Sequence, residues 1–207
     1  MKIANLLKFS ALGLVAVGSV TAATFNLSPT PADLYDLDHY YAYTWGISST
    51  QFTVPSGQVI TGASLSFSNI RNWKNETNAL FIHLLDSAPA GVTSTWEGNT
   101  GASNISDYFT GQGILLTTFV DSTFVSQNYT YTFTPSALTS LINYYNNGQN
   151  FALGFDPDCH YYNDGIKLTI TTGAPPSTTG VPDSGSSLIL LGLGLLGLAG
   201  LKRRMVA

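Results

Sequence analysis

Residues 64–68 read Ser-Leu-Ser-Phe-Ser, a strict alternation of polar and apolar residues. A period of two places successive side chains on opposite faces of the backbone, so this stretch predicts a β-strand with one buried and one exposed face. Residues 80–85 read Leu-Phe-Ile-His-Leu-Leu and are largely apolar on both faces. We therefore expect a second strand there that is covered on both sides.

Similar short runs recur along the chain. They lie at residues 114–120, 129–133, 151–155 and 166–170. Turn-forming residues separate them, and they are rich in Thr, Tyr and Phe but poor in Lys and Glu. This composition suits strands better than helices.

One segment breaks the strand pattern. Thr134 supplies an N-cap, Pro135 fits the first helical position, apolar residues then recur at helical spacing, and Gly148 supplies a stop. The sequence therefore predicts a short amphipathic helix over residues 135–147, laid against an edge or end of a sheet. Many strands with one helix predict a mainly β fold over residues 24–172, an antiparallel β-sandwich of the jelly-roll type.

Charge excludes one class of partner. Charged residues make up 10% of the chain, against roughly 25% in typical soluble domains. Residues 24–180 contain three basic side chains against eleven carboxylates, a net charge of −8. A body this acidic cannot neutralise phosphates, so no nucleic acid is expected as a partner. Cys159 is the only cysteine, which excludes an intramolecular disulfide and a multi-cysteine zinc site.

The first 23 residues have the organisation of a secretory signal peptide. Lys2 and Lys8 form a positive region, residues 9–20 form an uncharged apolar stretch, and small residues at 21–23 offer a cleavage site. Residues 1–23 are therefore predicted to be a signal peptide. The alternative is a buried helix of the mature fold.

The C-terminal segment has four parts in a fixed order. Residues 173–180 form a linker of small residues and proline. The parts that follow are the pentapeptide Val181-Pro182-Asp183-Ser184-Gly185, a Leu/Gly stretch at 188–201, and the basic cluster Lys202, Arg203 and Arg204. Residues 184–201 are just long enough for a transmembrane helix in a thin bacterial membrane. The basic cluster would stay cytoplasmic, which leaves the body outside the membrane.

This order of pentapeptide, hydrophobic helix and basic end resembles a PEP-CTERM protein-sorting signal over residues 181–207. Because Pro182-Asp183-Ser184 stands where most of that family has Pro-Glu-Pro, the resemblance is to the VPDSG-CTERM variant. It implies processing by an exosortase, a membrane-embedded cysteine protease-transpeptidase of Gram-negative bacteria that typically also make exopolysaccharide. It also implies transient anchoring in the inner membrane and delivery to the cell surface or extracellular matrix. The alternative is a plain tail anchor.

A polar cluster at residues 156–165 reads Asp-Pro-Asp-Cys-His-Tyr-Tyr-Asn-Asp-Gly. Ca²⁺ needs several oxygens, and one loop with closely spaced carboxylates can supply them. The candidate Ca²⁺ ligands are Asp156, Asp158, Asn163 and Asp164. The loop is not an EF-hand, because its fifth and sixth positions are His and Tyr. The alternative is a hairpin turn with solvated acids.

A second acidic segment, residues 33–39, precedes the first long strand and ends in His39. Together with Cys159 and His160 it offers the mixed oxygen, nitrogen and sulfur ligands of a transition-metal site. This hypothesis requires the two loops to meet, as they can if the first and last strands of a sandwich are neighbours. In the alternative, His39 and His160 are loop residues hydrogen-bonded to the backbone.

Amphipathic aromatic residues are more numerous than a core requires, with three Trp and eleven Tyr. The apolar faces of sugars stack on exposed aromatic rings, and both Trp73 and Trp96 lie in polar, loop-like stretches of sequence. They are therefore the predicted sugar contacts of a carbohydrate-binding module. The alternative is that both side chains are half-buried under loops.

Catalytic motifs are lacking. Glu76 and Glu97 have no partner carboxylate in a glycosidase-like motif, and the neighbours Cys159 and His160 lack an orienting group. The chain has no G-x-S-x-G, no HExxH and no phosphate loop. We therefore expect a non-catalytic, exported surface or matrix protein, structural or associated with exopolysaccharide. The alternatives are a carbohydrate-binding module with a Ca²⁺-stabilised loop and a secreted hydrolase.

Overall fold

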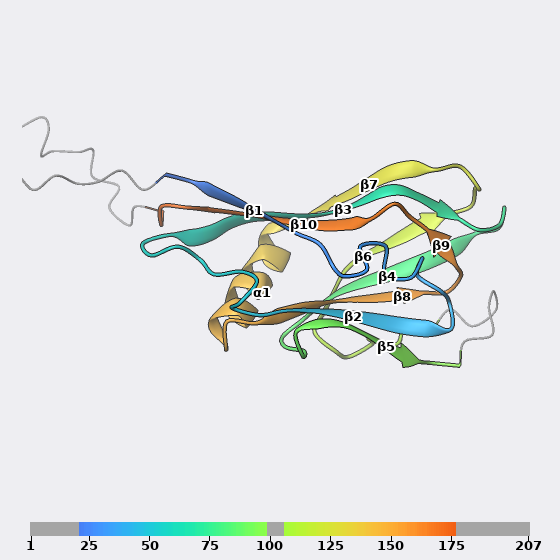
Figure 1. Ribbon diagram of the computed structural model, residues 1–207, viewed down its shortest axis with the longest axis horizontal. Coiled ribbons are helices and arrows are strands. Elements are labelled where there is room, and N and C mark those ends of the chain that lie inside the picture. The colour runs from blue at the N-terminus through green and yellow to red at the C-terminus, as the bar shows by residue number, and fades with distance from the viewer. Residues whose placement is uncertain (1–20, 99–105, 177–207) are drawn as a thin grey trace, which may run out of the picture. The chain divides into compact units, whose positions relative to one another are not determined.

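The structure, a computed structural model, describes residues 21–98 and 106–176. The predicted signal peptide up to residue 20 lies outside these ranges, as do the end of the linker and the whole sorting segment. The described strands form two antiparallel sheets (Figure 1).

Each sheet contains five strands. In spatial order, the first sheet contains β1 (Ala23–Leu27), β10 (Ile166–Gly173), β3 (Val59–Asn72) and β7 (Gln127–Thr132), with β9 (Tyr161–Tyr162) paired to the end of β3. The second contains β5 (Gly91–Trp96), β2 (Tyr41–Ile47), β8 (Phe151–Pro157), β4 (Asn78–Leu85) and β6 (Ile114–Asp121). Together with one short helix, they confirm the predicted mainly β fold with antiparallel sheets.

The hydrophobic core lies between the two sheets. Phe67 of β3 meets Phe155 of β8 edge to face, with ring centroids 6.0 Å apart. Phe119 of β6 and Tyr129 of β7 also cross the interface, with ring centroids 4.7 Å apart. Both contacts belong to one continuous cluster of side chains from both sheets. Burial of this apolar surface is the main force that holds the layers together.

The strand patterns read from the sequence are present in the structure. Leu65 and Phe67 of β3 are buried while the serines beside them are partly or fully exposed, so the predicted alternation is confirmed. β4 is buried on both faces, also as predicted. Its outer face is covered by the segment that contains Phe109, which packs with Leu85 in a second, small hydrophobic cluster.

The predicted helix is α1 (Pro135–Asn146), which ends one residue earlier than expected. The Thr134 hydroxyl accepts a hydrogen bond from the backbone N–H of Ala137 at 3.2 Å, which caps the first turn. Ala137, Leu141 and Tyr145 form the buried face at a spacing of four residues. Among the residues that the structure describes, no helix has the length and apolarity that a membrane span requires.

We call the end of the sheets at which the described body begins and finishes the terminal end, and the opposite end the distal end. At the terminal end, β1 begins opposite Thr172 and β10 finishes opposite Val59, so both termini of the described body leave the sheets there. At the distal end, Asn72 pairs with Tyr161 and Tyr41 pairs with Trp96. β3 runs between the ends, and its 14 residues separate them by about 40 Å at a rise of roughly 3.3 Å per residue.

Candidate functional site

The acidic segment before β2 folds into a left-handed turn. Leu34, Tyr35, Asp36 and Leu37 are consecutive and all have φ between 46° and 59°. This conformation costs about 1–2 kcal/mol for each non-glycine residue. The side chains of Leu34 and Leu37 are fully buried in the core, and their burial offsets that cost. The turn therefore has a fixed position from which Asp36 and Asp38 project.

This turn meets the loop around β9, as the transition-metal hypothesis required. The backbone N–H of Tyr161 donates to the Leu37 carbonyl at 3.4 Å, and that of Ile166 donates to the Ala32 carbonyl at 2.8 Å. The Asn163 side-chain amide donates to the carbonyl of Asp33 at 2.9 Å. The two loops are thus joined by several hydrogen bonds, although their residues are more than 120 positions apart.

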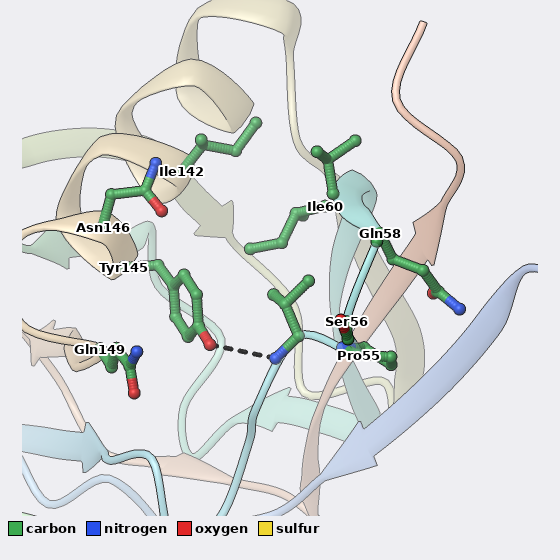
Figure 2. A pocket seen from close by; sticks show the side chains of 11 residues that line it. Pro55, Ser56, Gln58, Ile60, Ile142, Tyr145, Asn146 and Gln149 are labelled. Carbon is green, nitrogen blue, oxygen red and sulfur yellow. Dashed lines mark hydrogen bonds between the residues drawn. The ribbon is translucent and has the colours of Figure 1, made fainter. Parts of the chain in front are cut away.

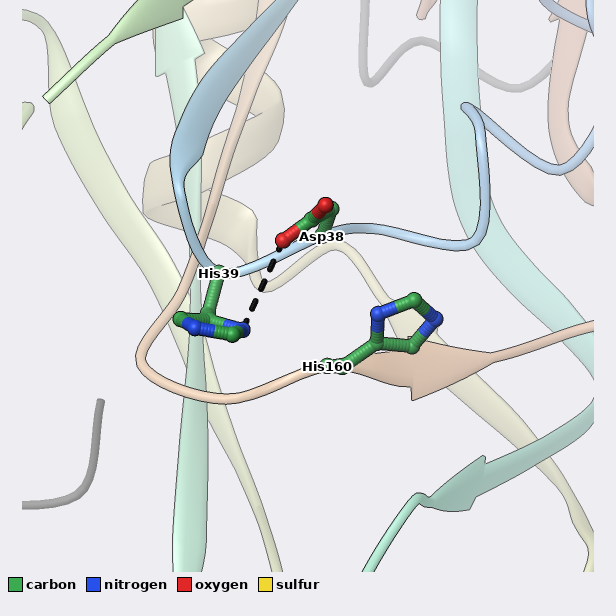
Figure 3. Close-up of side chains that lie close together, drawn as sticks. All are labelled: Asp38, His39 and His160. Atoms are coloured by element: carbon green, nitrogen blue, oxygen red, sulfur yellow. Dashed lines mark ion pairs between the residues drawn. The ribbon is translucent and has the colours of Figure 1, made fainter. Parts of the chain in front are cut away.

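Asp38, His39 and His160 come together where the loops meet (Figure 3). One potential ligand atom from each residue lies within 4.8 Å of the other two. The Oδ1 atom of Asp38 and the Nδ1 atom of His39 are 3.4 Å apart. Within residues 21–98 and 106–176, no other group of three His, Cys, Asp or Glu side chains gathers this closely.

The backbone of Asp38 is held by a buried tyrosine of β2. The Tyr43 hydroxyl accepts a hydrogen bond from the Asp38 N–H at 2.9 Å and donates to the Asp38 carbonyl at 3.5 Å. Burial raises the pKa of Tyr43 to about 12, so this hydroxyl stays protonated and can donate. The carboxylate of Asp38 in turn accepts from the N–H of Tyr40 at 3.1 Å.

The two imidazoles of this cluster are packed between aromatic rings. The His39 ring lies 4.0 Å from that of Tyr40, and the His160 ring lies 4.7 Å from that of Tyr162, measured between centroids. Burial lowers the pKa of His160, partly opposed by the charges of Asp36 and Asp38. His160 is therefore neutral at pH 7 and retains a lone pair that can bind a metal ion.

The predicted Ca²⁺ ligands are each bonded to a different part of the fold. Asp156 of β8 accepts from the N–H of Tyr108, and Asp158 accepts from the N–H of Ala79, both at 2.6 Å. Burial raises the pKa of both carboxyl groups, to about 6 for Asp158. Asp164 accepts from the Asn69 side-chain amide at 2.5 Å.

Asn163 and Asp164 do line a common polar pocket of about 440 Å³, at the distal end. The guanidinium of Arg71 also lines it and lies between two rings, 4.8 Å from Tyr162 and 4.7 Å from Phe124. The guanidinium opposes a second cation there, whereas the carboxylates of Asp36 and Asp164 in the same wall attract one. The Ca²⁺ site stays a prediction.

Cys159 lies apart from the histidines. Its thiol is buried and contacts Glu76, with 3.7 Å between Sγ and Oε1. Burial raises the pKa of the Cys159 thiol, which keeps it protonated and unsuited to metal binding. The distal cluster therefore offers nitrogen and oxygen ligands without sulfur.

A second group of buried ionisable side chains lies on the outer face of the second sheet. Glu97, just after β5, lies beside Asp156 of β8. Burial, followed by the charge of Asp156, raises the pKa of Glu97 to about 8. Nearby, His83 and Asp107 form a pair at 2.8 Å.

The predicted sugar contacts occupy different settings. Trp96 is 60% exposed and stacks on Tyr40, with centroids 5.2 Å apart and planes inclined by 12°. Trp73 is 40% exposed, and the ammonium of Lys74 lies 4.5 Å from its ring. Trp96 thus offers a free aromatic face at the distal end, whereas the ring of Trp73 is partly covered.

A small pocket of about 270 Å³ lies near Trp96. Its lining residues are Tyr35, Asp38, Tyr41, Tyr43 and Ser94. The Trp96 ring meets that of Tyr41 edge on, with centroids 5.3 Å apart. The sequence pattern pointed to Trp73 and Trp96 but not to this tyrosine pocket. Alternate spacing places Tyr41 and Tyr43 on one face of a strand, but the left-handed turn that brings in Tyr35 leaves no such signal.

A third pocket, of about 340 Å³, lies at the terminal end between α1 and residues 54–60 (Figure 2). The hydroxyl of Tyr145 accepts a hydrogen bond from the Val54 N–H at 3.0 Å across this pocket. Ile60 and Ile142 form an apolar wall, and amide side chains such as that of Gln149 complete the lining. It contains no titratable group apart from the hydroxyl of Tyr145.

Comparison with known proteins decides the nature of the C-terminal segment. Residues 180–205 match the family model described as the VPDSG-CTERM motif. This segment is a VPDSG-CTERM sorting signal. It is a PEP-CTERM-type signal recognised by an exosortase, and it implies export and surface attachment in Gram-negative bacteria. No curated protein matches the chain.

Proposed function

We propose that this chain is a non-catalytic protein of the bacterial surface or extracellular matrix, with a structural or exopolysaccharide-associated role. The VPDSG-CTERM signal at residues 180–205 carries the proposal, because it addresses the protein to an exosortase. The position of the chain ends adds support. β10 finishes at the terminal end, so the linker begins at the end of the body opposite the distal cluster.

We further infer that residues 24–172 form a jelly-roll sandwich. The order β1-β10-β3-β7 in one sheet and β2-β8-β4-β6 in the other supports this, with β5 added beside β2. The chain crosses between the sheets from β1 to β2, β2 to β3, β3 to β4, β6 to β7, β7 to β8 and β8 to β9, whereas β4, β5 and β6 stay in one sheet. Repeated crossings of this kind are typical of the Greek-key connections of that architecture. This scaffold is used by many unrelated binding proteins, so it supports export of a binding body without naming its ligand.

Intact mass of the protein recovered from the cell surface tests the sorting proposal. The mature chain should lack about the first 22 residues and should be cut near residues 183–185, as implied by signal-peptide and sorting-signal processing. Pro182→Ala should block the second cut, and Pro176→Ala in the linker is the matched control that should be processed normally. Recovery of surface protein that retains residues 202–204 would contradict exosortase processing.

A second candidate function, carbohydrate binding, is favoured by the distal aromatic surface. Exposed aromatic rings stack on the apolar faces of sugars, and Trp96 and Tyr35 are both more than half exposed. Tyr35 lines the tyrosine pocket, and Trp96 lies beside it against Tyr41. The carboxylate of Asp38 and the hydroxyl of Ser94 also line this pocket and can bond to sugar hydroxyls. Together these groups form a shallow site of the size of one or two sugar rings.

A glycan array with the full chain tests this second function. Trp96→Ala and Tyr35→Ala should each reduce binding to any glycan that the wild type retains. Tyr108→Ala removes an aromatic ring that is 39% exposed and lies outside the pocket, and it should leave binding unchanged. Equal losses in all three variants, or no glycan retained by the wild type, would leave the structural role as the better proposal.

A further inference from the structure

We propose that Asp38, His39 and His160 bind a divalent transition-metal ion of the class that prefers imidazole and carboxylate ligands, with Zn²⁺ as its probe. This inference is independent of the sorting and glycan proposals. Two imidazoles and one carboxylate are a frequent ligand set for first-row metal ions in proteins. Here they come from two loops that are hydrogen-bonded to each other at the distal end.

The spacing of the ligand atoms suits a metal ion better than a hydrogen bond. Zn–N and Zn–O bonds of about 2.0–2.1 Å place neighbouring ligands of a tetrahedral site roughly 3.3–3.4 Å apart. The Oδ1 atom of Asp38 and the Nδ1 atom of His39 are already 3.4 Å apart. The third ligand atom, from His160, lies within 4.8 Å of both. It must approach by no more than about 1.5 Å, which side-chain rotation can supply.

Both imidazoles also have a nitrogen that lacks a partner. Among the described residues, no group hydrogen-bonds to Nδ1 of His39 or Nε2 of His160, and both atoms are inaccessible to solvent. A buried polar atom without a partner costs about 1–3 kcal/mol. The contact of His39 with Asp38 is close but does not meet hydrogen-bond geometry. Coordination of an ion by His39 would supply the partner that its Nδ1 atom lacks.

The surroundings favour a cation and hold the ligands in place. Asp36 adds a second carboxylate charge that acts on His160. The left-handed turn and the hydrogen bond to the Tyr43 hydroxyl hold the backbone of Asp38 in place. Aromatic rings pack beside both imidazoles. Because the backbone of Asp38 is already held in place, less conformational entropy is lost when the ion binds.

Three protein ligands leave at least one coordination position for a water or another oxygen ligand. Asp38 lines both this cluster and the tyrosine pocket, so an ion here would share a wall with that pocket.

Calorimetric titration of the tag-free full chain in detergent with ZnCl₂ tests the inference. The wild type should bind one ion per chain. Asp38→Asn, His39→Gln and His160→Gln should each weaken binding by about 100-fold or more, since loss of even an outer-shell partner costs 10–100-fold. Asp38→Asn keeps an oxygen that can accept from the Tyr40 N–H, so its fold should be retained.

Asp33→Asn is the matched control, because Asp33 lies in the same turn, also caps a backbone N–H, and stands outside the cluster. It should bind Zn²⁺ as the wild type does. Co²⁺ titration adds a readout in the wild type alone: direct coordination should produce a visible ligand-field absorption band. Absence of saturable Zn²⁺ binding by the wild type would overturn the proposal. Equal weakening by Asp33→Asn would also overturn it, since general attraction to an acidic loop would then explain the binding.

Discussion

At the terminal end of the body, the Tyr145 hydroxyl accepts a hydrogen bond from Val54. At the distal end, Tyr161 is fully buried, and its hydroxyl has no partner among the described residues. Such orphan groups are rare in folded proteins, because burial without a hydrogen bond costs free energy. The terminal end is thus built for stability, whereas the distal end retains polar groups that stability alone does not require.

The same contrast holds for the buried polar side-chain atoms that lack a partner within the described ranges. Those at the distal end belong to His39, Glu97, Asp156, His160 and Tyr161, and only that of Asp86 lies at the terminal end. Departures from local rules in natural proteins concentrate at functional sites. The distal end, with its left-handed turn and orphan atoms, is therefore where ligand binding is to be sought.

The prediction with the largest expected effect is that the body folds by itself, without the two terminal segments. Residues 24–180 should fold cooperatively without the signal peptide and the sorting segment, because the core is made by the two sheets and α1. Far-ultraviolet circular dichroism should show mainly β signal with a small helical part, and a single thermal transition. A mainly helical spectrum, or aggregation in every buffer, would contradict the architecture.

Replacing one buried leucine at each end by alanine shows how much the packing at each end contributes to stability. Leu141 of α1 and Leu37 of the left-handed turn are both fully buried. Leu141→Ala should lower the free energy of unfolding by about 3 kcal/mol, and Leu37→Ala by about 2 kcal/mol, because a loop relaxes into the cavity more easily than a packed helix. Urea denaturation measures both. An equal or larger loss for Leu37→Ala would show that the distal turn is as firmly packed as the terminal end.

The buried acid pair of the distal end should make stability depend on pH. Since folding raises the pKa of Glu97 to about 8 from an ordinary value near 4.5, its protonated form is favoured in the folded state. The stabilisation is complete below about pH 4.5 and is lost as pH rises through 8. Between pH 6.5 and 8.5 the free energy of unfolding should fall by about 1 kcal/mol, allowing for the partial exposure of Glu97.

Glu97→Gln should remove most of this decline, whereas Glu76→Gln, the other glutamate of the body, should preserve it. Two other groups contribute less to the slope in this window. Asp158, with a pKa near 6, is mostly ionised there. Burial lowers the pKa of His160, so its contribution to stability rises with pH and opposes part of the decline, and Glu97→Gln leaves that contribution unchanged. A wild type whose stability is flat from pH 6.5 to 8.5 would contradict the raised pKa of Glu97.

The smallest expected effects have opposite signs at the two ends. Tyr145→Phe removes the bond to Val54 and should destabilise the body by about 1 kcal/mol. Tyr161→Phe removes a hydroxyl without a partner and should be neutral or stabilising by up to about 1 kcal/mol. Thermal melts of the two variants, side by side, measure the difference. If Tyr161→Phe destabilises as much as Tyr145→Phe, its hydroxyl is satisfied by a bound water and the contrast weakens.

Several features could be predicted from the sequence because their signals are local. The period-two stretch at residues 64–68 became part of β3, and Thr134, Pro135 and Gly148 marked the ends of α1 within one residue. Residues 181–185 marked the sorting signal in the same way. In each case the pattern lies within a few residues and needs no partner from elsewhere in the chain.

The sequence named His39 and His160 as candidate ligands, but only the tertiary structure decided which side chains meet at the distal end. Asp156 and Asp158 alternate in sequence, which suggested a shared ion, yet each carboxylate bonds a different backbone N–H. His39 and His160 are 121 positions apart, and they meet only because β9 pairs with the end of β3 and a left-handed turn crosses beside it. Non-glycine residues disfavour that turn locally, so only burial of its leucines in the assembled core makes it stable.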